Sequence, residues 1–270
     1  MKRGVAAAKI NLALVVGRRR RDGKHELVTV YQRIALTDRI EVRESAQTEV
    51  TGFADDTLVR RALDAVTENG DGRLAARIDK RIPVAAGLGG GSADAAAAMT
   101  LGNQMLRDPL PNERLEAIAR ELGSDVPFFL RDGPQLGAGD GTELRPLDLP
   151  QDYWVLIVVP HEDRKTSTRD VYVRFDARGG ERGFAERTAA LLAALERVRR
   201  PRDLTALPPN DLASSPLADE LRALGAFRAD VTGAGPAVYG LFLHRAAAVA
   251  AQRCLRGRGR TWLTAPAWYV

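Results

Sequence analysis

Apolar and polar positions alternate near the start of the chain with the two-residue period of a β-strand. Over residues 5–16, Lys9 and Asn11 fall on one face together with Ala7. The opposite face is apolar and carries Ala8, Ile10, Leu12 and Leu14. Lys9 is therefore predicted to lie on the polar side of a strand.

The segments that follow mix strand and helix patterns. An Asp-Gly turn at residues 22–23 predicts a hairpin, and two strand-like runs come next, near residues 26–36 and 39–43. The acidic pair at residues 55–56 is placed to cap a helix, after which residues 74–84 are typical of a strand. These patterns predict a β-rich first lobe.

The stretch PVAAGLGGGSAD, residues 83–94, stands between that strand and an alanine-rich segment with strong helix propensity, which we expect to begin near Ser92. A glycine loop at a helix N-terminus directs backbone N–H groups and a positive dipole end at an anion. No Lys follows the glycines, as a nucleotide P-loop requires, and Ser92 interrupts the dinucleotide fingerprint. We therefore predict a loop that binds the phosphates of ATP; the alternative is a plain flexible turn.

A further helix is expected from Asn112 to Gly123, and the sequence SDVPFFL follows it directly. Residues 132–152 are rich in Gly, Pro and Asp and predict a lobe boundary, so we divide the chain into lobes of residues 1–150 and 151–270. The second lobe is predicted to contain a strand at 153–160, helices near 184–200 and 217–224, a strand-loop-strand over 230–243, and a last helix and strand.

The composition is that of a globular protein, with 45% apolar and 28% charged residues, and no run approaches the roughly 18 apolar residues of a membrane span. Lys9 and Asn11 interrupt the apolar start, so it is not expected to be a signal peptide. The single Cys254 forms no internal disulfide, and no Cys/His group has zinc-ligand spacing. We predict a cytoplasmic protein with no membrane partner and with a metal bound through oxygen.

A net charge of +5 and arginine clusters at residues 18–21, 197–200 and 256–260 raise the possibility of a nucleic-acid partner. These arginines are interspersed with Asp and Glu, and no aromatic-interleaved basic surface accompanies them. We therefore predict no nucleic acid, and note that a basic surface also suits a polyphosphate substrate.

Three separated motifs resemble those of the GHMP kinases, named for galactokinase, homoserine, mevalonate and phosphomevalonate kinases. They are AKINLALVVGRRRRDGKHEL, the glycine loop and VTGAGPAVYG, in the order of the family and over nearly the whole chain. The resemblance implies an α+β fold of two lobes, with a ribosomal protein S5 domain 2-like N-terminal lobe and a ferredoxin-like C-terminal lobe. We expect a monomer or a homodimer.

AKINL, RDGKHEL, LGSDVPFFL and PNDL further resemble the family members that use ATP to phosphorylate the 2-hydroxyl of a cytidylyl sugar-alcohol diphosphate in the non-mevalonate route to isoprenoid precursors. Lys9 and Asp125 match the catalytic pair: Asp125 as the general base, and Lys9 as the cation that keeps it ionised and offsets phosphoryl charge. Asn11, Lys24 and His25 match substrate positions, with His25 near the cytidine.

The resemblance also implies ATP and Mg²⁺, with Ser92 as a metal ligand. The positions that match the loop for the ATP phosphates are Pro83, Val84, Ala85, Ala86, Gly87, Leu88, Gly89, Gly90, Gly91, Ser92 and Ala93. The third motif, residues 232–237, is expected to border the site, although it also suits a tight hairpin turn. We interpret Asn210 and Asp211 as a structural turn.

Each catalytic or substrate assignment has an alternative. Asp125 is placed to cap a helix at Val126-Pro127, Lys9 suits a solvated strand lysine, and His25 suits an ordinary hairpin residue. The alternatives for the whole chain are a GHMP kinase for another small alcohol, such as homoserine or a mevalonate-type alcohol, and a non-catalytic ligand-binding relative.

The sequence departs from the family pattern at two positions. Lys24 stands where members usually carry a Tyr able to stack on a base, and Thr57 stands where Asn is common near the adenine. Neither position belongs to the catalytic pair or to the glycine loop. The departures therefore weaken the assignment of the substrate more than that of the reaction.

Overall fold

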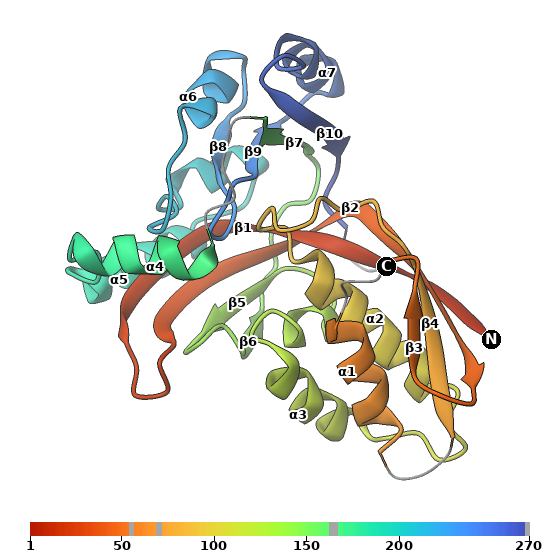
Figure 1. The fold of residues 1–270 in the computed structure, drawn as a ribbon. Helices are drawn as coiled ribbons and strands as arrows, with labels where there is room; N and C mark the ends of the chain where they lie inside the picture. Colours follow the sequence, from red (N-terminus) through yellow and green to blue (C-terminus); the bar gives the residue numbers. More distant parts are fainter. Residues whose placement is uncertain (54–56, 69–71, 162–166, 268–270) are drawn as a thin grey trace.

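The computed structural model describes residues 1–53, 57–68, 72–161 and 167–267, which form two β-sheets with helices around them (Figure 1). The six strands of the first sheet are β1 (Lys2–Arg19), β2 (His25–Ser45), β3 (Glu49–Thr51), β4 (Arg73–Asp79), β5 (Gln135–Ala138) and β6 (Glu143–Pro146). They are ordered β3-β4-β2-β5-β6, and β1 pairs with β2. The predicted α+β class is confirmed.

β1 and β2 form one long antiparallel hairpin around the predicted Asp-Gly turn at residues 22–23. The two strand-like runs expected after this turn are a single strand, so their division was wrong. The apolar pattern breaks at Asp38, but its buried carboxylate accepts hydrogen bonds from the backbone N–H groups of Arg81 and Ile82. A polar residue inside the strand is tolerated because it is hydrogen-bonded.

A β-bulge interrupts β1. A register shift between Asn11 and Ala13 leaves Leu12 as an extra residue, so Leu12 and Ala13 both face the largest apolar cluster. Leu14 then turns to the side of Lys9 and lines the same cavity. The predicted alternation is therefore wrong from Ala13 onward, because the pattern alone does not show where the extra residue lies.

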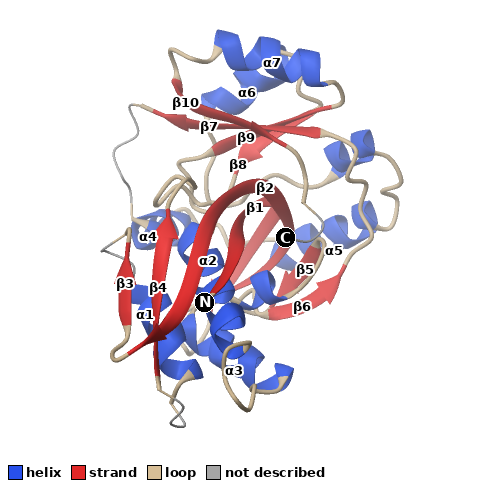
Figure 2. Cartoon of the chain, turned by 90° about the vertical axis from the view of Figure 1, so that its right-hand side faces the viewer, coloured by secondary structure: helices blue, strands red, loops and turns tan. Residues whose placement is uncertain are grey.

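The helical elements of the first half lie on one side of the first sheet (Figures 1 and 2). They are α1 (Thr57–Val66), α2 (Gly90–Asn103), α3 (Asn112–Leu122) and the 3-10 turn η1 (Pro127–Leu130). α2 begins two residues before the predicted start, and the proposed cap at residues 55–56 lies outside the described residues. The alanines of α2 allow close packing, and most of the helix is buried.

The second sheet is antiparallel, in the order β10-β7-β9-β8. Its strands are β7 (Trp154–Pro160), β8 (Arg228–Val231), β9 (Val238–Phe242) and β10 (Gly259–Thr264), and helices α6 (Pro216–Ala223) and α7 (Arg245–Cys254) pack on it. Four antiparallel strands in this order, with one helix before β8 and one before β10, make the ferredoxin-like arrangement that we expected.

Three helical elements are inserted between β7 and β8, namely α4 (Thr168–Ala177), α5 (Phe184–Leu195) and η2 (Pro201–Ala206). The sequence did not predict α4, and α5 ends earlier than expected. No helix within the described ranges is long and apolar enough to cross a membrane.

The first part of the segment 132–152, which is predicted to hold a lobe boundary, forms the β5–β6 hairpin, in which Leu136 pairs with Arg145. Gly139 and Gly141 have positive φ and lie in the turn of this hairpin. The division at residue 150 falls between β6 and β7 and stays a prediction.

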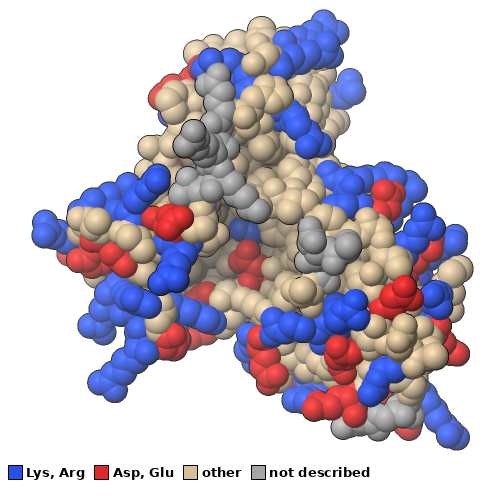
Figure 3. Space-filling view, in the orientation of Figure 1, with Lys and Arg blue, Asp and Glu red and all other residues tan. Residues whose placement is uncertain are grey.

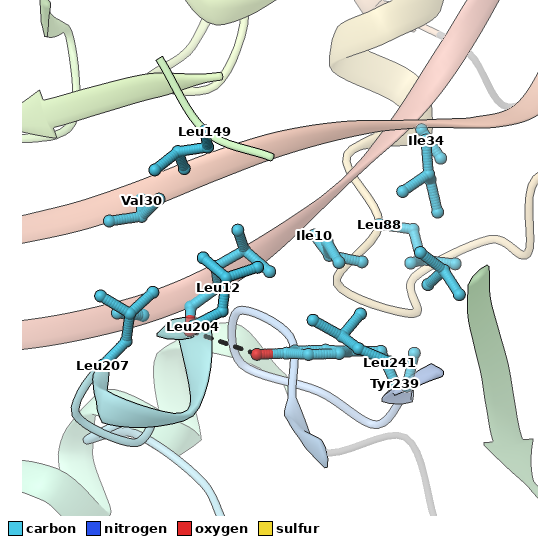
Figure 4. Packing of buried hydrophobic residues seen from close by; sticks show 14 of the residues in the cluster. Ile10, Leu12, Val30, Ile34, Leu88, Leu149, Leu204, Leu207, Tyr239 and Leu241 are labelled. Carbon is cyan, nitrogen blue, oxygen red and sulfur yellow. Dashed lines mark hydrogen bonds between the residues drawn. The ribbon is translucent and has the colours of Figure 1, made fainter. Parts of the chain in front are cut away.

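The two sheets share one apolar core (Figure 4). The cluster joins Ile10, Leu12, Val30 and Ile34 of the first sheet to Val155, Ile157, Tyr239 and Leu241 of the second. The hydroxyl of Tyr239 donates to the Leu12 carbonyl oxygen at 3.2 Å, and the buried Arg228 donates to the same oxygen at 2.6 Å. These two hydrogen bonds from the second sheet hold the bulge of β1 in place.

Candidate active site

A cavity of about 820 Å³ lies between β1, the glycine loop, the turn before β9 and helix α4. In the space-filling view the surface is hollowed between the side that carries α4 and α5 and the body of the molecule (Figure 3). The residues that line the cavity come from both halves of the sequence. Its position between the sheets makes it the candidate active site.

Lys9, Asn11 and Asp125 meet at the centre of this cavity. Lys9 Nζ donates to Asn11 Oδ1 at 2.7 Å and lies 3.5 Å from Asp125 Oδ2. Asn11 Nδ2 in turn donates to Thr29 Oγ1 at 2.8 Å, which fixes the orientation of the amide. Lys9 is only 4% exposed, so the alternative of a solvated strand lysine is wrong.

Asp125 faces this lysine with one oxygen and a tyrosine with the other. The hydroxyl of Tyr31 donates to Asp125 Oδ1 at 3.1 Å. Burial, and then the charge of Asp125, raise the pKa of Tyr31 well above its usual value, so the phenol stays a donor. The turn η1 is capped at Val126 without a side-chain bond, so the alternative of Asp125 as a helix cap is wrong.

The glycine loop has the backbone of an anion site. Ala85, Gly87 and Gly89 have positive φ, and a Cβ at Gly87 would lie 2.3 Å from the carbonyl oxygen of Thr232. The Leu88 carbonyl accepts from the backbone N–H of Lys9 at 2.9 Å, so the loop rests on β1. The first turn of α2 leaves its N–H groups without helical acceptors.

The predicted ATP loop separates two cavities. Ala85, Gly87, Gly89 and Ser92 line the large one, while all residues 83–92 line a smaller cavity of about 260 Å³ with Phe53, Leu58 and Lys80. Ala93, the last residue predicted for this loop, is buried in the packing of α2 and lines neither cavity.

The far end of the large cavity holds His25. Its imidazole stacks on Tyr172 with ring centroids 4.6 Å apart, and Nε2 donates to Asp176 Oδ1 at 2.7 Å. Burial raises the pKa of Tyr172 to about 12, so its ring is neutral. Tyr172 and Asp176 were missed because α4 was missed, although their four-residue spacing places both on one helix face.

Lys24 crosses the rim of the cavity from the β1–β2 turn. Its Nζ lies 2.5 Å from Asp140 Oδ2 and 3.3 Å from Ser124 Oγ, next to Asp125. Burial alone would raise the pKa of Asp140, but hydrogen bonds from Lys24 and Thr142 lower it below its ordinary value. Lys24 is therefore an ion-paired residue at the position where members of the resembled family usually carry a stacking Tyr.

The third motif borders the cavity as predicted, through residues 233–235. Thr232 Oγ1 accepts from the backbone N–H of Asn11 at 3.0 Å, which joins this turn to β1. Asn210 Nδ2 donates to the carbonyl oxygens of Val231 and Gly233, in agreement with its structural interpretation.

The described residues contain no group of three or more His, Cys, Asp or Glu side chains that could hold a metal ion. Ser92, the predicted metal ligand, lines the cavity from the first turn of α2. This donor set suits Mg²⁺ that is held mainly by phosphate oxygens.

Comparison with known proteins places the chain in a family. The family model for the GHMP kinases N terminal domain matches residues 57–133, and the model for the GHMP kinases C terminal domain matches residues 190–261. A solved mevalonate kinase of Methanococcus jannaschii shares the fold, with a TM-score of 0.75 at 14% identity, and covers 98% of each chain.

Relatives with higher identity carry one name. The 4-diphosphocytidyl-2-C-methyl-D-erythritol kinase of Anaeromyxobacter dehalogenans (strain 2CP-C) is 37% identical over 95% of this chain and 85% of its own, and that of Geobacter sulfurreducens is 34% identical over 96% of both. A crystal structure of 4-(cytidine 5'-diphospho)-2C-methyl-D-erythritol kinase has a TM-score of 0.79 at 31% identity, covering 98% of this chain and 99% of that one. The chain therefore belongs to the GHMP kinase family, in which it is similar to the 4-diphosphocytidyl-2-C-methyl-D-erythritol kinases.

Proposed function

We propose that the chain transfers the γ-phosphoryl group of ATP to the 2-hydroxyl of 4-diphosphocytidyl-2-C-methyl-D-erythritol. The observation that carries the proposal is the Lys9–Asp125 pair, because it faces the same cavity as the glycine loop at one end and His25 at the other. The name shared by the relatives supports this choice of alcohol.

In the proposed reaction Asp125 accepts the proton of the substrate 2-hydroxyl. The oxygen of that hydroxyl forms a bond to the γ-phosphorus of ATP, and the bond from this phosphorus to the β,γ-bridging oxygen breaks, which releases ADP. Tyr31 holds Asp125 in place through the 3.1 Å hydrogen bond. Lys9 is buried beside the carboxylate and offsets the negative charge of the transferring group. Most of the catalysis then comes from positioning and electrostatics.

The nucleotide is proposed to place its phosphates against the free N–H groups at the start of α2 and its adenine in the smaller cavity, against Phe53 and Leu58. Mg²⁺ is proposed to bind with the triphosphate, and Ser92 would hold it for the protein. When bound, the ion neutralises phosphate charge.

The cytidine end is proposed to lie against His25 and Tyr172, whose stacked rings offer flat apolar area to a base. Lys24 provides a charge rather than a ring, so we assign it to the diphosphate of the substrate. We place the enzyme in the cytoplasm, as a monomer or homodimer with no nucleic-acid partner.

The test is ADP release by the purified protein with Mg²⁺ and ATP, compared across 4-diphosphocytidyl-2-C-methyl-D-erythritol, homoserine, mevalonate and methylerythritol phosphate. We expect turnover with the cytidylyl substrate alone. Turnover with another of these alcohols would keep the phosphotransfer but reject the substrate. Absence of turnover with all four would overturn the proposed function and favour a non-catalytic ligand-binding role.

A further inference from the structure

A second lysine, Lys80, lies against the glycine loop on the side of the smaller cavity, away from the Lys9–Asp125 pair. Lys80 Nζ is 2.7 Å from Asp38 Oδ2 and 2.5 Å from Asp94 Oδ2, and it lines the smaller cavity. The side chains of both carboxylates are 0% exposed and that of Lys80 is 12% exposed. We call Lys80, Asp38 and Asp94 the rear cluster.

The rear cluster joins the two ends of the glycine loop. Asp38 Oδ1 accepts the backbone N–H groups of Arg81 at 2.5 Å and Ile82 at 2.8 Å, which lead into the loop. Asp94 lies in α2, directly after the loop. Lys80 bonds to both carboxylates, so it ties the entry of the loop, its exit and strand β2 together.

The same lysine packs against the start of α2. A Cβ at Gly90 would lie 3.1 Å from Lys80 Nζ and 3.0 Å from Ile82 Cγ2, so the helix begins in close contact with the rear cluster. The N–H groups of this first turn are those that face an anion. Their direction therefore depends on where Lys80 holds the helix.

The rear cluster is a poor device for stability alone. One cation faces two buried carboxylates, and Asp94 Oδ1 has no hydrogen-bond partner. Burial raises the pKa of Asp94 to about 8, although the charge of Lys80 opposes the shift. Burying these charges costs desolvation free energy that apolar side chains would not. The arrangement is therefore explained by the geometry that it fixes and not by a gain in stability.

We propose that Lys80, Asp38 and Asp94 are positioning residues for phosphoryl transfer, which fix both ends of the glycine loop so that its N–H groups meet the phosphates of ATP. The inference rests on the nucleotide half of the proposed function and not on the identity of the alcohol. It assigns the rear cluster no contact with the reacting atoms.

The test is equilibrium binding of ATP to Lys80→Met, measured by titration calorimetry without any alcohol. We expect the affinity to fall by about tenfold or more, because the loop loses a charged tie at both ends. Amide hydrogen exchange should accelerate over residues 81–93 and at Lys9, whose N–H donates to Leu88 of the loop, and stay unchanged over α4. The matched control is Arg81→Ala, which removes an exposed side chain from the same segment but keeps the backbone N–H bound to Asp38.

ATP affinity within about twofold of the wild type in folded Lys80→Met would overturn the inference, and so would faster exchange spread evenly over the chain. If Lys80→Met does not fold, Lys80→Gln replaces it, because the Gln amide can still donate to a carboxylate. ATP affinity and the exchange over residues 81–93 are then measured again, and both are expected to change in the same direction by a smaller amount. The wild type could phosphorylate none of the four alcohols while Lys80→Met still shows a lower ATP affinity and faster exchange over residues 81–93. In that case the proposed function fails and this inference stands.

Discussion

The Lys9–Asp125 pair and the rear cluster place the same residue types on the two cavities that the glycine loop divides. Their lysines are similarly buried, with side chains 5% and 12% exposed. Their carboxylates differ, because the side chain of Asp125 is 34% exposed and those of the rear cluster are 0% exposed. A carboxylate that reaches the cavity can exchange a proton with a ligand, whereas an enclosed one can only hold protein groups in place. The exposure of the carboxylate therefore distinguishes Asp125, proposed to accept a proton, from Asp38 and Asp94, proposed to position the loop.

The strongest way to break this comparison is Asp125→Asn. We expect kcat to fall by about 10²–10⁴-fold, because the amide does not accept the proton of the hydroxyl. ATP affinity and thermal stability should stay close to the wild type, since the side chain is partly solvated. ADP release with the cytidylyl substrate measures the rate, and a variant with near-normal turnover would remove Asp125 from the role of general base.

Lys9→Met sharpens the contrast with Lys80→Met. We expect the loss of Lys9 to lower kcat by about 10²-fold, since the charge of the transferring group is no longer offset. Asp125 remains partly solvated, so the free energy of unfolding should change little. Loss of Lys80 leaves the buried carboxylate of Asp38 without its cation and should lower that free energy by about 3–5 kcal/mol. Denaturant unfolding of Lys9→Met and Lys80→Met measures both free energies of unfolding. Equal losses in the two variants would contradict the proposed difference between the two lysines.

Tyr31→Phe tests how firmly the accessible carboxylate is held. The raised pKa keeps the phenol a hydrogen-bond donor, and its removal costs Asp125 one partner without burying a new charge. We expect kcat to fall by about tenfold, the equivalent of one hydrogen bond to a charged group, with the KM for ATP unchanged. A change confined to the KM would place Tyr31 in binding rather than in orientation of Asp125.

The smallest effect on activity is expected for Asp94→Asn, which should instead change stability with pH. The pKa of Asp94 is about 8 in the folded chain and near 4 when unfolded, so the wild type loses stability as the pH rises from 4 to 8. The amide mimics the protonated acid. The variant should match the wild type below pH 4 and gain on it by at most about 1.4 kcal/mol per pH unit up to pH 8. Thermal unfolding across this range measures the effect, and a constant offset would contradict the assignment.

The sequence predicted the parts of the fold that depend on local signals. The Asp-Gly turn, the helix at Asn112 and the strands of the second sheet were found because turn chemistry and periodicity act over a few residues. The bulge at Leu12 and the continuity of β2 through Asp38 were missed. Both depend on partners far along the chain, Arg228 and Tyr239 in one case and residues 81–82 in the other.

The candidate site divides in the same way. Lys9, Asp125 and the glycine loop were predicted from motifs, and the structure brings them to one cavity. Tyr31, Tyr172 and Lys80 were not, because nothing in an isolated Tyr or Lys distinguishes one that faces a cavity from one that faces solvent. What makes them members of the site is burial and pairing, which exist only after distant segments meet.

The bulge in β1 also gives the cavity a fixed length. Lys9 and Leu14 lie on the same side of one strand, five residues apart, so the Lys9–Asp125 pair and the apolar side chain of Leu14 are held about 15 Å apart along the cavity by the strand backbone. An alcohol that is too short to extend from Lys9 to Leu14 would leave part of the cavity filled with water. If the chain has the proposed function, we expect it to select among alcohols by their length as well as by their contacts.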